Sequence, residues 1–403
     1  MFAVAKIVVT LAIVVFLLNR KVKMGNAMLA GSGVLLLLSG LNLVHLQTAV
    51  LETVTNPSTW EIVLALYFVM CLEYQLRSGG IVDGLMSTAR KVMRSDRILL
   101  ALMPAFLGFL PSLGGAIFSA PLVENASKSY KLTAETKTAI NYWFRHVWEF
   151  TNPILASMLL ASQLASIPLN TLISNMVWVT AFAIIIGWMF FLSPLKSDQS
   201  AVQPDSAVTD ADSGYYYVAL AAGPIIANFF LVVVVKLAAS VSMAIVVVAM
   251  VLILRQGFSD IRTMLVHAFD RKLLWGIVAI LFFQNILRQT GAIEDIAALL
   301  NNLAVSNAII IGAIAFVSGI LTGTSQGFIA LTFPFIAVLA PGDIELATLS
   351  FVLGIAGQML SPAHLCLIVT LDYFKADFLK TLQPIALLEI IMIAAACIVA
   401  RIA

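Results

Sequence analysis

A polar face interrupts one of the long apolar stretches of this chain, directly before a proline. Its members follow the spacing i, i+4, i+7, i+8 and i+11 of one helical face, and they are Asn141, Arg145, Trp148, Glu149 and Asn152. An ionisable group inside a membrane span is costly and is therefore a functional candidate. Arg145 could bind an anionic substrate, and His146 or Glu149 could take a proton. The alternative is an Arg145–Glu149 pair, four residues apart, in which the two charges only neutralise each other.

Two apolar stretches are broken by proline, within Thr151-Asn152-Pro153 and within Ser361-Pro362-Ala363-His364. Proline removes a helical hydrogen bond, and the residue before it avoids helical geometry. Asn152 or Ser361 could then offer an oxygen to a cation or a hydroxyl to an anion. His364 is a further candidate for a substrate or proton role. A simple proline kink, healed by neighbouring Ser and Thr, remains the alternative.

A small-residue cluster precedes each break, over residues 108–116 and 319–327, and we expect each to form the tip of a helical hairpin. Carbonyls freed at such a tip suit a small cation, and the N–H groups of the next helix suit an anion. Close helix packing is the alternative. The predicted substrate-binding residues are Ser112, Gly114, Gly115, Asn152, Thr324, Ser325, Ser361, Arg145 and His364. The predicted ion-coupling residues are Thr151, Asn152, Thr322, Ser361, Glu149 and His146.

The two halves of the chain repeat each other. Residues 76–83 (LRSGGIVD) return as residues 287–294 (LRQTGAIE), and residues 108–111 (GFLP) return as residues 319–322 (GILT) at the same offset of 211. A duplicated membrane half that contains interrupted helices is typical of secondary transporters.

The composition excludes an ordinary soluble protein. Hydrophobic residues make up 61% of the 403 residues and charged residues 11%, whereas soluble domains carry roughly 25% charge. The three cysteines, Cys71, Cys366 and Cys397, are isolated, so neither a disulfide nor a metal framework is expected. Apart from sodium at the hairpin tips, the sequence predicts no metal or cofactor. The apolar run after Lys6 is interpreted as a retained first span and not as a removed signal peptide.

The predicted fold is an all-α polytopic membrane protein with two five-span halves, about ten spans plus two re-entrant hairpins. Residues 1–192 form the first repeat, 193–214 a cytoplasmic linker and 215–403 the second repeat. The expected elements of the first half are spans 2–19, 25–44 and 57–76, a hairpin at 98–126, a broken span at 134–165 and a span at 170–192. Those of the second half are spans 215–235, 237–254 and 273–287, a hairpin at 307–340, a broken span at 345–374 and a span at 383–401. Residues 81–94 and 256–270 are expected to lie at the membrane surface.

The basic residues predict the orientation. With both termini outside, the cytoplasmic segments contain 18 of the 23 Lys and Arg residues, as the positive-inside rule requires. Because five spans is an odd number, the second half enters the membrane upside down, and the repeat is inverted.

With an inverted five-span repeat, two hairpins and two proline-broken spans, the chain resembles the ion transporter superfamily, and within it most closely the prokaryotic domain of unknown function 401 family. The resemblance implies a scaffold domain that dimerises and a transport domain, made of the hairpins and the broken spans, that moves like an elevator. Relatives with carboxylate substrates carry a Ser-Asn-Thr type motif at both tips. Here the tips read Pro111-Ser112-Leu113-Gly114 and Thr322-Gly323-Thr324-Ser325, and the missing asparagine argues against a dicarboxylate.

These observations predict a secondary active transporter of a small, anionic organic metabolite, coupled to sodium or protons, in the inner membrane of a prokaryote. Its expected partners are the substrate, membrane lipid and a second copy of the chain, with no nucleic acid. An ion channel or a cation/proton antiporter is the alternative. An intramembrane enzyme is less favoured, because the sequence has no HExxH, GxSxG or paired-aspartate signature.

Overall fold

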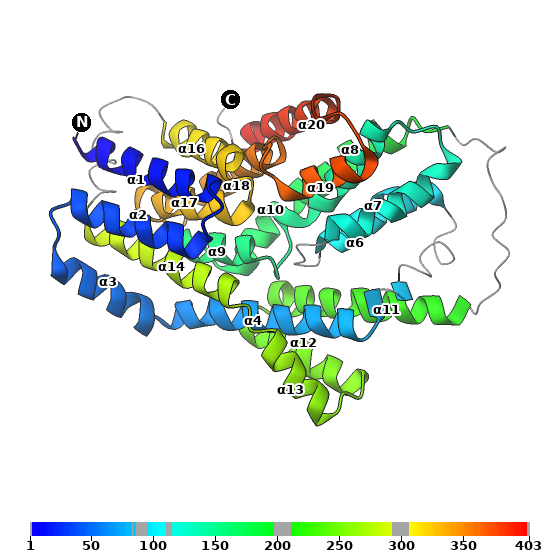
Figure 1. Cartoon of the computed structure of the whole chain (residues 1–403), viewed down its shortest axis with the longest axis horizontal. Helices are drawn as coiled ribbons and strands as arrows, with labels where there is room; N and C mark the ends of the chain where they lie inside the picture. The colour runs from blue at the N-terminus through cyan, green and yellow to red at the C-terminus, as the bar shows by residue number, and fades with distance from the viewer. Residues whose placement is uncertain are drawn as a thin grey trace.

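The computed structural model describes residues 2–82, 84–85, 95–109, 115–196, 211–291 and 306–400, and every regular element in these ranges is helical (Figure 1). Four of the described helices are long and apolar enough to cross a membrane. They are α4 (Pro57–Ser78), α10 (Leu169–Gly187) with its continuation to Leu192, α11 (Ala211–Phe229) with its continuation to Val234, and α20 (Phe378–Val399).

Apolar side chains also cover the outside of the molecule. In α12 (Ala239–Ile253), the exposed side chains of Val241, Ile245, Val248 and Leu252 recur every three or four residues, which is one helical face. Water would penalise such a stripe, whereas lipid would not. The surface therefore suits a membrane protein.

The N-terminal helices are α1 (Phe2–Asn19), α2 (Met24–Leu38) and α3 (Leu43–Thr55), which precede α4. The span expected at 25–44 ends early, because Gly40 and Leu41 adopt positive φ angles of 92° and 44°. Asn42 then caps α3 by accepting a hydrogen bond from the backbone N–H of Val44. No element was predicted over most of α3.

The two predicted hairpins and the two predicted breaks coincide with helix ends. The hairpin helices are α6 (Asp96–Phe109) with α7 (Gly115–Ala126), and α16 (Asn307–Thr322) with α17 (Ser325–Leu339). The first broken helix comprises α8 (Ala134–His146), a 3-10 turn (Val147–Phe150) and α9 (Ala156–Leu164). The second comprises α18 (Ile344–Met359) and α19 (Leu365–Phe374).

Two further helices complete the second half, α13 (Phe258–His267) and α14 (Arg271–Gln289). The first lies within the 256–270 segment expected at the membrane surface, and its Phe258 is 85% exposed. Most of the matching 81–94 segment, and most of the linker, lie outside the described residues.

The helices pack as two groups, each drawn from both halves of the chain. One group contains α1–α4 with α11–α14, in which α2 packs on α14 and α4 on α12. The other contains α6–α10 with α16–α20, in which α8 packs on α19 and α9 on α17. In Figure 1, α4, α11 and α12 run along the lower side, and α7, α8, α19 and α20 lie above them.

The contacts of the two halves correspond in pairs. When α1–α10 are matched in order with α11–α20, the contact of α6 with α8 corresponds to that of α16 with α18. Likewise, α7 packs on α19 and α17 on α9, and α8 packs on α20 and α18 on α10.

Two glycines 211 residues apart permit close approaches of this kind. A Cβ atom on Gly108 of α6 would lie 1.9 Å from the carbonyl oxygen of Arg145 in α8. A Cβ atom on Gly319 of α16 would lie 2.3 Å from the carbonyl oxygen of Gly354 in α18. Both hairpins therefore press their first helix against the backbone of a broken helix.

Candidate functional site

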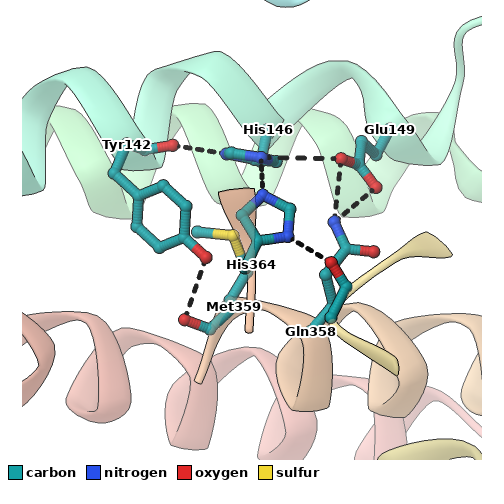
Figure 2. Close-up of polar contacts among 7 residues, drawn as sticks. Tyr142, His146, Glu149, Gln358, Met359 and His364 are labelled. Atoms are coloured by element: carbon teal, nitrogen blue, oxygen red, sulfur yellow. Dashed lines mark hydrogen bonds and ion pairs between the residues drawn. The ribbon is translucent and has the colours of Figure 1, made fainter. Parts of the chain in front are cut away.

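The two broken helices meet at a pair of buried histidines. His146 is the last residue of α8 and His364 immediately precedes α19, and their Nε2 atoms are 3.0 Å apart (Figure 2). The side chains are 5% and 6% exposed. The two residues are 218 positions apart in the chain, so this contact joins its two halves.

Both imidazole rings are oriented by backbone carbonyl groups. His146 Nδ1 lies 2.6 Å from the carbonyl oxygen of Tyr142, and His364 Nδ1 lies 2.7 Å from that of Gly323. Because a carbonyl oxygen can only accept, each Nδ1 carries the hydrogen and donates it. The Nε2 lone pairs of the neutral rings then face each other, so the contact needs a cation between them, either a proton or a metal ion.

A carboxylate lies beside this pair. Glu149 Oε1 is 3.7 Å from His146 Nε2, and Gln358 Nε2 donates to Oε1 and Oε2 of the same carboxylate at 3.1 and 3.3 Å (Figure 2). Gln358 is 1% exposed and belongs to α18, so the second half of the chain fixes Glu149 of the first half. The negative charge is therefore held next to the histidine pair.

A thiol completes the cluster. Cys366 follows His364 by two residues, and its Sγ lies within 4.8 Å of one ring nitrogen of each histidine. One sulfur and two imidazole nitrogens thus lie close together.

Further hydrogen bonds fix α8 against the second half. The Tyr142 hydroxyl donates to the carbonyl oxygen of Met359 at 3.1 Å (Figure 2), and Asn141 Nδ2 donates to Thr370 Oγ1 at 3.2 Å. Both Asn141 and Tyr142 are completely buried. These bonds hold α8, and with it His146, against α18 and α19.

The residues before the two prolines hold the ends of the hairpins. Asn152 Nδ2 donates to the carbonyl oxygen of Phe109 at 2.8 Å, and the Ser361 hydroxyl donates to that of Ile320 at 2.5 Å. Phe109 and Ile320 are 211 residues apart, which is the offset of the sequence repeat. Each of the two side chains also accepts a hydrogen bond from the backbone N–H two residues later. Asn152 Oδ1 accepts from Ile154, and Ser361 Oγ accepts from Ala363.

The predicted threonines are also engaged within the protein. Thr151 Oγ1 lies 2.9 Å from Thr180 Oγ1 of α10, and Thr322 Oγ1 donates to the carbonyl oxygen of Ser318 at 2.8 Å. Thr324 caps α17 by accepting the N–H of Gly327 at 3.2 Å, and Ser325 is the first residue of that helix.

The second hairpin turns at Gly323, which has a φ of 60°. The carbonyl group of this glycine is the one that accepts from His364, so the tip contacts the histidine pair directly. In the first hairpin, Gly115 begins α7, whereas Ser112 and Gly114 lie outside the described residues.

Arg145 is buried, with 6% of its surface exposed, and directly precedes His146. The Glu149 carboxylate, four residues further on, contacts His146 and Gln358. The structure thus brings His146, Glu149 and His364 together, and it ties Asn152 and Ser361 to their own hairpins.

A small cavity adjoins the histidine pair. His146, Trp143, Met359 and Glu389 line it together with Val147, Phe150, Ala183, Ile355 and Met392. Glu389 of α20 is 3% exposed, so a second carboxyl group is buried close to His146.

The sequence analysis did not predict Cys366, Gln358 or Tyr142 as members of the site. The short spacing of His364 and Cys366 was the available signal for the thiol. The pairing with His146 had no local signal, because it depends on how the two halves pack.

This geometry belongs to an all-helical, transporter-like membrane fold. The chain is a member of the family described as "Protein of unknown function (DUF401)", which matches residues 3–402, and the resemblance inferred from the sequence is thereby confirmed. The fold is similar to the crystal structure of the YdaH transporter of Alcanivorax borkumensis, with a TM-score of 0.56, 16% sequence identity and 88% of each chain covered. No match was found among curated proteins.

Proposed function

We propose that this protein is a secondary active transporter of a small organic anion in the inner membrane of a prokaryote, coupled to a sodium or proton gradient. The observation that carries the proposal is the meeting of both broken helices at one buried polar site (Figure 2), within a fold similar to that of a transporter. Broken helices that face each other in this way form substrate sites near the membrane midplane in transporters.

The proposal includes an inverted repeat of two five-span halves with re-entrant hairpins. It is supported by the paired helix contacts and by the two hydrogen bonds from Asn152 and Ser361 to carbonyl groups 211 residues apart. Two unrelated halves would have no reason to form these hydrogen bonds at equivalent positions of the repeat.

The charge of Arg145 supports an anionic substrate. A guanidinium group is always protonated and recognises carboxylate or phosphate through two parallel hydrogen bonds. Arg145 lies at the end of α8, next to the point where the two halves meet. Its charge would therefore act on a ligand bound between the breaks.

The grouping of the helices supports elevator-type movement. We assign α1–α4 and α11–α14 to a scaffold that forms a homodimer, and α6–α10 and α16–α20 to the moving transport domain. The ion-coupling residues predicted from the sequence remain part of this proposal, with the oxygens of Thr151, Asn152, Thr322 and Ser361 suited to sodium.

A thermal-shift screen tests the ligand class. The purified protein is heated with a panel of organic anions, cations and neutral solutes, each in sodium and in potassium salts. A ligand that binds only the folded state raises the Tm as its concentration exceeds its Kd. We expect a small anion to raise the Tm, with a larger shift in sodium if sodium is the coupling ion. A panel in which only cations or neutral solutes raise the Tm would contradict the anion assignment.

A further inference from the structure

We propose that His146, His364 and Cys366 form a binding site for a transition-metal dication of the zinc type. This site goes beyond the proposed transport function, and the sequence analysis predicted no such site. The cluster is one in which one ligand atom from each residue lies within 4.8 Å of the others.

The orientation of both imidazole rings is that of metal ligands. A histidine bound to a metal almost always donates its other ring N–H to a carbonyl or carboxylate group, which fixes the tautomer. His146 and His364 both do so, at 2.6 and 2.7 Å from the carbonyl oxygens of Tyr142 and Gly323. Their Nε2 atoms, 3.0 Å apart, are thereby left with the lone pairs that a metal ion would need.

The distances suit a tetrahedral ion. Zinc bonds of about 2.0–2.1 Å to nitrogen and about 2.3 Å to sulfur separate neighbouring ligand atoms by roughly 3.3–3.6 Å. The two Nε2 atoms are 3.0 Å apart, and rotation of the Cys366 side chain can bring its sulfur closer than the present limit of 4.8 Å. Only small side-chain movements are needed to complete the site.

The ligand types define the class of metal. Imidazole and thiolate bind zinc, cobalt, nickel and copper, whereas sodium, magnesium and calcium prefer oxygen. Glu149, 3.7 Å from His146 Nε2, can supply the fourth ligand, and Gln358 already orients its carboxylate. Two neutral imidazoles, a thiolate and a carboxylate would balance the charge of a dication.

A metal bound here would join the two halves of the chain. It would connect His146, at the end of α8, to His364, which precedes α19, and to Cys366, the second residue of α19. With His146 on a metal, ion coupling would depend on the oxygen-bearing residues of the breaks and the tips.

Cobalt spectroscopy on the purified, chelator-stripped full-length protein tests the site. Co²⁺ reports tetrahedral geometry through intense visible bands and reports a thiolate ligand through a charge-transfer band in the near ultraviolet. We expect both sets of bands to saturate at one Co²⁺ per chain and to disappear when Zn²⁺ is added.

The variant Cys366→Ser should lose the charge-transfer band and bind Zn²⁺ at least about tenfold more weakly. The matched control is Cys397→Ser, because Cys397 is also partly buried and lies outside the cluster. It should leave the spectrum and the affinity unchanged. His364→Gln provides the second test, with its Tm in the metal-free state used to check folding.

The inference is overturned if Co²⁺ produces no saturable bands, or if Cys366→Ser binds metal as the wild type does. Because this experiment uses no substrate and no gradient, its failure would not count against the transport proposal.

Discussion

In the proposed transporter, the side chain of Arg145 would decide the sign of the substrate's charge. If its guanidinium group binds an anion through two parallel hydrogen bonds, Arg145→Lys should strongly reduce uptake, because an ammonium group cannot reproduce that geometry. If Arg145 only balances the charge of Glu149, the lysine variant should transport normally. Initial uptake rates of the two proteins, compared at equal amounts in the membrane, distinguish the two roles.

A double-mutant cycle supplies the control for Arg145. Under the anion hypothesis, Arg145→Gln abolishes uptake, and adding Glu149→Gln does not restore it. Near-wild-type uptake by the double variant would instead show that the two charges only neutralise each other.

Asn152 and Ser361 should contribute to stability through the same kind of hydrogen bond. Asn152→Ala removes the side-chain donor to the buried carbonyl group of Phe109, and Ser361→Ala removes that to the part-buried carbonyl group of Ile320. Each substitution should lower the free energy of unfolding by about 1–3 kcal/mol, measurable as a lower Tm.

Ser350→Ala is the matched control for this pair. Ser350 is completely buried in α18, and its hydroxyl has no hydrogen-bond partner among the described residues. Removing it should leave the Tm unchanged or raise it. If Ser350→Ala lowers the Tm as much as Ser361→Ala does, the hydrogen bond to Ile320 is not what stabilises the second break.

At the scale of single residues, the sequence predicted the positions that depend on neighbours in the chain. Asn152 and Ser361 lie at breaks because a proline follows each of them, and Pro153 and Pro362 are visible in the sequence. The contact between His146 and His364 could not be predicted, because it depends on the packing of α8 against α19.

At the scale of helices, two close backbone contacts depend on Gly108 and Gly319. Gly108→Ala and Gly319→Ala would each place a methyl group against a backbone carbonyl oxygen that cannot move without displacing a helix. Both should destabilise the protein at or above the upper end of the roughly 1–3 kcal/mol that overpacking costs. The Tm of the purified variants and their yield in the membrane measure this effect.

Gly33→Ala is the control for these glycine substitutions. Gly33 lies inside α2, and nothing lies within 4 Å of the position that its Cβ would occupy. Alanine should be neutral there or stabilising by roughly 0.5–1 kcal/mol, because glycine disfavours a helix. Equal losses of Tm in all three variants would mean that the close helix contacts are not the cause.

The helices that were predicted best are those bounded by strong local signals. The broken stretches at 134–165 and 345–374 were recognised from apolar runs that contain a proline, and the structure interrupts both there. No such signal marked α3, because its apolar residues are mixed with Gln47, Thr48 and Glu52. A short helix of mixed polarity lacks the long apolar run on which the span predictions depended.

At the scale of the whole molecule, the proposed topology places both termini outside and the linker at 193–214 in the cytoplasm. A single cysteine at Gln199, in a chain whose three native cysteines are replaced by serine or alanine, tests it. We expect a membrane-impermeant thiol reagent to label this cysteine only after the cells are opened. Labelling of this cysteine in intact spheroplasts would show that the orientation is the opposite of the one proposed.

The membrane character and the family of the chain could be predicted from the sequence, because both depend on composition and on the order of elements. The grouping of the hairpins with the broken spans was expected from the family resemblance, whereas the side-chain contacts between the halves could not be predicted, since they depend on how the helices pack. The packing of the two halves brings His146 of α8 against His364, and Glu149 of the following turn against Gln358.

Uptake into proteoliposomes tests the central claim most directly. The purified protein is reconstituted, loaded with potassium buffer and exposed to a radiolabelled anion identified by its thermal shift, with an inward sodium gradient, a proton gradient or no gradient. Our account predicts saturable accumulation of the anion above its external concentration, with one of the two gradients and not without it. Uptake that rises linearly with concentration and stops at equal concentrations on both sides, whatever the gradient, would show that the protein is a channel and not a secondary transporter.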